Sequence, residues 1–115
     1  MRFHFTPSFA VVSVALLFTS AAHAQAETPI PRSMQGDKGK YYLIETKKSG
    51  DVVLAVHKRV GVDSIGFTRT ETNCKTRQMR VLGYGEGSVA SIQGPATKWF
   101  DLVPGSSKSD VAAFV

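Results

Sequence analysis

Beyond residue 39, apolar and polar side chains alternate in short runs separated by turn residues. In the run Val52–Val60 the even-numbered positions are apolar apart from Lys58, whereas His57 and Arg59 occupy odd-numbered positions. Alternation with a period of two is typical of a strand with one covered face. Runs rich in β-branched and aromatic residues, bounded by Gly, Pro, Ser or Asn, predict six strands. They lie at residues 40–46, 52–60, 65–72, 75–84, 88–93 and 97–103.

The C-terminal segment follows a helical spacing instead. Val111, Phe114 and Val115 fall three and four positions apart, which gives a helix one apolar face. Ser106 or Ser107 can cap the start of this helix. A helix of about ten residues is not stable alone in water, so it must pack on the sheet. The pattern predicts an α+β domain, with an antiparallel sheet of about six strands and one C-terminal helix packed on it.

The N-terminus has the features of a secretory signal peptide. Phe9–Thr19 is an apolar run, and Ala22-His23-Ala24 supplies the small residues that signal peptidase recognises. The run is too short to span a bilayer, and a buried N-terminal helix is the alternative. We therefore expect residues 1–24 to be a signal peptide, residues 25–38 a flexible leader and residues 39–115 one domain. The exported chain is expected in the periplasm, at the cell surface or secreted, without a transmembrane segment.

Charge narrows the class of partner. One of the 14 Lys and Arg residues, Arg2, precedes the cleavage point, so 13 remain against nine Asp and Glu, a net charge of +4. A basic exported protein suits an acidic extracellular or envelope protein, or a polyanion such as polysaccharide. The alternative is that the charge serves only solubility. Nucleic acid is not expected as a partner outside the cytoplasm.

Catalytic and metal-binding patterns are missing from the sequence beyond the predicted signal peptide. That part has one His, His57, and one Cys, Cys74, whereas a metal site needs three or four ligands at set spacings. We therefore predict no catalytic residues, no metal, no cofactor and no enzyme activity, with His57 as a solvent-facing strand residue. Large aromatic side chains are expected in the core rather than on a binding surface. These are Tyr84, Trp99, Phe100 and Phe114.

Cys74 has three interpretations. It is a half-cystine whose partner lies outside this chain, a thiol that cross-links two chains, or a reactive nucleophile. An odd cysteine is notable in an exported protein, where small domains commonly carry disulfides.

Basic residues gather on either side of Cys74. If neighbouring strands pair, Arg69, Lys75, Arg77 and Arg80 fall near one another, and they would form a positive patch for a protein or a polyanion. The alternative is a solvated sheet edge on which Lys and Arg oppose strand-to-strand aggregation.

The order of several features resembles the surface-adhesin E-like family of small exported bacterial proteins. The features are Cys74-Lys75-Thr76-Arg77, an aromatic-glycine turn, Lys98-Trp99, and Val103-Pro104-Gly105-Ser106 before a C-terminal helix. The resemblance implies a curved antiparallel sheet with the helix held across it by a disulfide. One half-cystine lies in the sheet, matched by Cys74, and the other at the helix end. This sequence stops at Val115, about where that second Cys is expected, so a truncated product and a missing disulfide both stay open.

The resemblance also implies contact with host or extracellular macromolecules. We therefore expect a small exported non-enzymatic binding module, adhesin-like, whose ligand the sequence does not name. The alternative is a periplasmic inhibitor or envelope-stress protein that inserts a loop into an enzyme, with the loop at residues 84–87.

Export gives the first test. Because the small residues follow the apolar run directly, Ala24 or Ala26 should be the last residue removed. N-terminal sequencing of the periplasmic fraction measures this, and recovery of the intact chain from the cytoplasm would contradict it.

Overall fold

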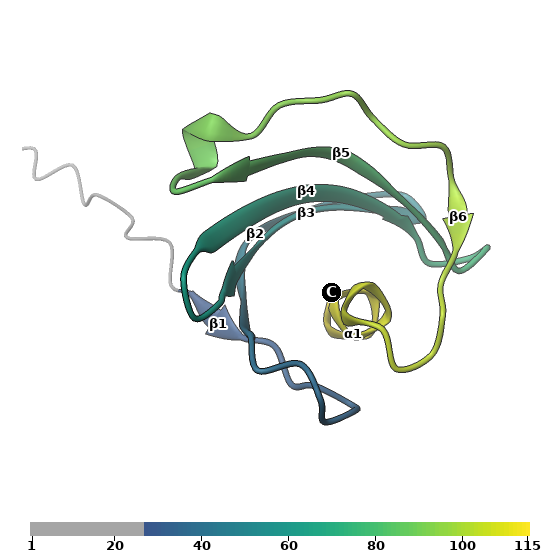
Figure 1. Ribbon diagram of the computed structural model, residues 1–115. Coiled ribbons are helices and arrows are strands. Elements are labelled where there is room, and N and C mark those ends of the chain that lie inside the picture. The colour runs from purple at the N-terminus through teal and green to yellow at the C-terminus, as the bar shows by residue number, and fades with distance from the viewer. Residues whose placement is uncertain (1–26) are drawn as a thin grey trace, which may run out of the picture.

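The computed structural model describes residues 27–115, so the predicted signal peptide lies outside the described residues. Six strands form one antiparallel sheet in sequence order, and the helix α1 lies within its curve (Figure 1). This confirms the predicted α+β class. The elements are β1 (Thr28–Pro29), β2 (Lys40–Ser49), β3 (Val52–Val60), β4 (Ile65–Asn73), β5 (Gln78–Glu86), the 3-10 helix η1 (Val89–Ser91), β6 (Phe100–Asp101) and α1 (Ser107–Phe114).

Local turn chemistry sets where β5 begins. The Oδ1 atom of Asn73 accepts hydrogen bonds from the backbone N–H groups of Lys75 and Thr76, at 3.0 and 3.1 Å. An Asn side chain that bonds the backbone ahead of it favours a turn over a continuing strand. The strand predicted from residue 75 therefore starts at Gln78.

The strand predicted at residues 88–93 is wrong, because this segment contains η1. Gly87 has φ +86°, a left-handed conformation that glycine adopts readily, and Ser91 Oγ donates to the carbonyl of Ser88 at 2.6 Å. The 3-10 helix η1 packs closely on β5, because a Cβ atom added to Gly85 would lie 2.4 Å from the carbonyl carbon of Ser91.

The strand predicted at residues 97–103 is reduced to β6. Thr97 still follows the edge of β5, because its backbone N–H donates to Val81 O at 2.8 Å. The N–H of Val81, however, donates to the Thr97 hydroxyl at 2.9 Å instead of to a backbone carbonyl. Because a side-chain hydroxyl takes the place of the backbone acceptor, the regular ladder of backbone hydrogen bonds is interrupted here.

The predicted flexible leader is ordered where it meets the sheet and the helix. Thr28 and Pro29 pair with Leu43 and Tyr42 as β1, and Ile30 is buried in the core. Their pairing partners lie in β2, later in the chain, so the composition of residues 25–38 does not reveal this pairing. Residues 28–30 of the predicted leader therefore have a fixed place in the fold.

The face of β3 that α1 covers is the opposite of the predicted one. Val53 and Ala55 lie at odd-numbered positions, are almost fully buried, and share their face with His57. His57 is only 6% exposed, so its predicted solvent-facing position is wrong. Val53 and Met79 both pair with Thr72, which puts this face of β3 on the side where the core lies.

The core sits between α1 and the concave face of the sheet (Figure 1). Its fully buried members are Met79 on β5 and Val111 on α1. Three of the four aromatic residues predicted in the core are more exposed than expected. Tyr84 is 49% exposed, Trp99 38% and Phe114 37%. The fourth, Phe100, is half-buried and packs against the core.

No helix in residues 27–115 has the length and apolar content that a bilayer-spanning helix needs.

Met79 tests this core. Met79→Ala should lower the free energy of unfolding by about 2–5 kcal/mol, because a fully buried side chain leaves a cavity. Chemical denaturation measures the loss. The matched control Val62→Ala, at a residue 87% exposed, should change it by less than about 0.5 kcal/mol. Equal effects of the two substitutions would contradict the assigned core.

Candidate functional site

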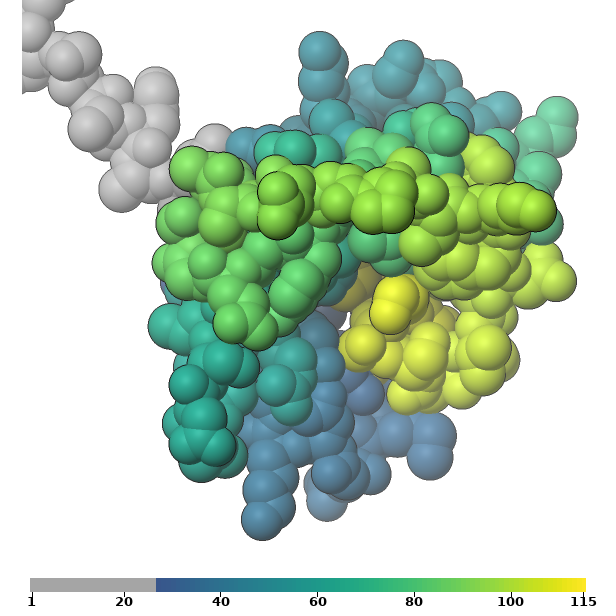
Figure 2. Space-filling view, turned by 45° about the horizontal axis from the view of Figure 1, so that its top comes forward, coloured from purple at the N-terminus to yellow at the C-terminus, as the bar shows by residue number. Residues whose placement is uncertain are grey.

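A groove of about 400 Å³ lies between the start of α1 and the concave face of the sheet. In the space-filling view the molecule is hollowed between α1, in yellow, and the green residues around the end of β5 (Figure 2). Volumes of this size are typical of small-ligand pockets. We call it the His57 groove, and the lining residues that matter here are Tyr41, His57, Thr68, Tyr84, Ser107 and Lys108.

His57 is the most enclosed polar side chain of the groove. It is 6% exposed, its Nδ1 atom is buried without a hydrogen-bond partner, and its ring centroid lies 6.4 Å from that of Tyr41. Burial, and then the charge of Lys108, lower the pKa of His57 to about 4. The imidazole is therefore neutral at pH 7.

The first turn of α1 contributes backbone donors. Ser106 caps the helix, since its Oγ accepts from the backbone N–H of Ser109 at 3.1 Å and donates to Val103 O at 2.6 Å. The N–H groups of Ser107 and Lys108 have no acceptor among the described residues. Unpaired N–H groups at a helix start carry the positive end of the helix dipole.

Arg59 lines the same groove, but its charge is already balanced. Its Nη2 atom lies 2.7 Å from Asp37 Oδ1, and its Nε donates to the Tyr41 hydroxyl at 3.1 Å. Hydrogen bonds from Arg59 and Tyr41 hold the pKa of Asp37 well below its usual value. The bond to Asp37 raises the pKa of Arg59 in turn. Lys108 forms no ion pair with any carboxylate among residues 27–115, so it is the uncompensated cation of the groove.

The chemistry of the groove follows from these donors. Among the described residues that line it, none carries a carboxylate that could pair with the imidazole. In residues 27–115 no three His, Cys, Asp or Glu side chains are grouped to hold a metal ion. The arrangement suits an electron-rich, negatively charged ligand.

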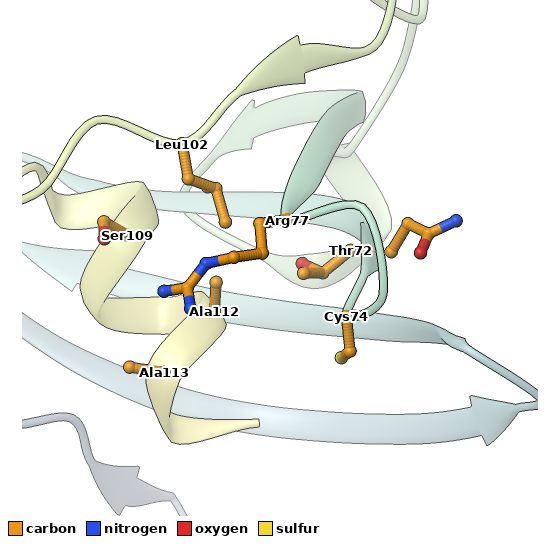
Figure 3. A pocket seen from close by; sticks show the side chains of 8 residues that line it. Thr72, Cys74, Arg77, Leu102, Ser109, Ala112 and Ala113 are labelled. Atoms are coloured by element: carbon orange, nitrogen blue, oxygen red, sulfur yellow. The ribbon is translucent and has the colours of Figure 1, made fainter.

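Cys74 lines a second, smaller cavity of about 250 Å³ beside residues 109–113 of α1, called here the Cys74 pocket. Arg77 has φ +58° and reaches from the turn toward α1, with Ala112 and Ala113 on the far wall (Figure 3). The exposed thiol is free among the described residues. Cys74 shares this pocket with Ala112 and Ala113 of α1, and the disulfide that the family resemblance implies stays a prediction.

The four basic residues predicted to form one patch separate between the two faces. Arg69 lines a shallow convex-face pocket with Glu71, whereas Arg77 lines the Cys74 pocket beside α1. Arg80 pairs with Glu71 at 2.8 Å and lies 5.1 Å from the centroid of the Trp99 ring. Lys75 is exposed in the turn.

The sequence analysis did not identify Lys108, the uncompensated cation of the His57 groove. The signal available was its place just after the predicted cap, Ser106 or Ser107, because cations are unusual where a helix dipole is positive. Nothing in the pattern indicated which strand residues would lie opposite it.

Comparison with protein-family models, with curated proteins and with solved structures finds no match to this chain. The resemblance to the surface-adhesin E-like family therefore stays a prediction.

Proposed function

We propose that the protein is an exported, non-enzymatic binding module that holds a polyanion in the His57 groove. One observation carries the proposal: the uncompensated Lys108 stands at the open start of α1, beside a groove lined by His57, a buried side chain whose Nδ1 atom has no partner. Export rests on the predicted signal peptide. An adhesin-like role rests on the resemblance to the surface-adhesin E-like family.

Charge placement supports a polyanion. Ion pairs neutralise Arg59 on the rim and Arg80 on the convex face, whereas Lys108 keeps its charge for a partner. A cation in a concave setting attracts an acidic ligand more strongly than the same charge on a flat surface. The neutral state of His57 and the absence of a lining carboxylate favour binding over proton transfer.

The alternative, an inhibitor that inserts a loop, depended on a protruding segment at residues 84–87. Tyr84 to Glu86 belong to β5, and η1 packs back on that strand. No observation on the described residues favours this function, so we do not propose it.

Heparin chromatography tests the proposal. The protein should bind heparin at low salt and elute as salt rises, because exposed charges are screened within ~10 Å at 0.1 M salt. Lys108→Glu should elute at a clearly lower salt concentration than the wild type. Lys48→Glu, which makes the same charge change at an exposed position on β2, is the matched control.

A third variant distinguishes the His57 groove from the basic patch that the sequence predicted. It carries reversed charges at Lys75, Arg77 and Arg80. Its elution from heparin should change only as its net charge changes, with no loss specific to one site. Equal elution of the Lys108 and Lys48 variants would contradict the His57 groove as the binding site.

A further inference from the structure

We propose that the His57 groove has a subsite for one tetrahedral oxyanion, the sulfate or phosphate group of a larger ligand, between the start of α1 and the buried imidazole. This inference rests on the proposed function and deepens it, because it names the chemical group that the groove recognises.

On its helix side, the subsite has unpaired backbone N–H donors and the positive charge of Lys108. The N–H groups of Ser107 and Lys108 have no acceptor among the described residues, and the Lys108 ammonium has no carboxylate partner there. Helix starts bind anions because their unpaired N–H groups and the helix dipole act together. A charge-assisted hydrogen bond is roughly twice as strong as a neutral one.

The sheet side supplies the second, independent observation. The side chain of His57 is only 6% exposed, and its Nδ1 atom has no hydrogen-bond partner, although buried polar atoms are normally hydrogen-bonded. A neutral imidazole has one N–H donor and one acceptor nitrogen. A ligand in the groove that contacts the ring can therefore accept a hydrogen bond from the N–H group of the imidazole.

Geometry favours a tetrahedral group over a planar carboxylate. The donors come from α1 on one wall, and from β3 and β4 on the other, where His57 and Thr68 line the groove. A tetrahedral oxyanion presents oxygens in several directions at once, whereas the two oxygens of a carboxylate lie in one plane. The groove is far larger than the oxyanion alone, and the rest of the ligand would pass Tyr84, which is 49% exposed.

The carboxylates of Asp37 and Asp110 are held outside the groove. Asp37 is bound by Arg59 and Tyr41, and Asp110 by Arg32 and the N–H of Ser33. Neither lines the His57 groove. An incoming anion therefore meets no carboxylate among the described residues that line the groove.

Nuclear magnetic resonance of the ¹⁵N-labelled protein tests the subsite. Sodium sulfate and sodium phosphate are titrated separately at constant ionic strength with chloride, and acetate is titrated as the planar anion. We expect saturable shifts of the Ser107 and Lys108 amides and of the His57 ring nitrogens with sulfate and phosphate. Lys108→Gln should weaken the apparent affinity about tenfold, the ratio that corresponds to one charge-assisted hydrogen bond, and Lys48→Gln should leave it unchanged.

Two results would overturn the inference: sulfate and phosphate shifts that do not saturate, or acetate shifts as large and as saturable as theirs. The heparin experiment tests the proposed function separately from the subsite. If Lys108→Glu lowers heparin elution but the free oxyanions bind nowhere, the proposed function stands and the subsite is wrong. If sulfate saturates the groove while Lys108→Glu elutes with Lys48→Glu, the subsite stands and the polyanion function is wrong.

Discussion

The contact between Asp110 and the N-terminal segment holds the two ends of the domain together. The Asp110 carboxylate lies 3.0 Å from Arg32 Nε, accepts from the backbone N–H of Ser33 at 3.1 Å, and is only 7% exposed. Hydrogen bonds from Ser33, and then the charge of Arg32, hold the pKa of Asp110 below its usual value. A carboxylate this buried is tolerated only when it is paired, so the segment after β1 and the helix must be positioned together.

The candidate site depends on the same contact. A helix of eight residues has little stability of its own, and Val111 and Asp110 are its two buried residues. Lys108 belongs to the same helix, two positions before Asp110, so the pairing that docks Asp110 also sets where the ammonium and the free N–H groups lie. The His57 groove is the space that this docked helix leaves over the sheet.

Hydrophobic alternation predicted the bounds of β3 correctly but not which face α1 covers. Val53 and Val56 are both buried, on opposite sides of the strand, so a period of two could not distinguish the faces. The position of His57 under α1, and the pairing of Arg32 with Asp110, depend on contacts between residues far apart in the chain. The sequence therefore predicted the class of fold and the helix cap region, whereas the groove required the packing of α1.

Native-state hydrogen exchange of α1 tests this dependence most directly, in Asp110→Asn and in the control Asp63→Asn at an exposed turn residue. Removing the Asp110 charge leaves Arg32 without its buried partner, so amides such as Val115 N–H, bonded to Val111 O, should exchange at least about tenfold faster. Amides of β3 and β4 should keep their protection, and Asp63→Asn should match the wild type. Unchanged protection of α1 in Asp110→Asn would contradict the claim that this contact docks the helix.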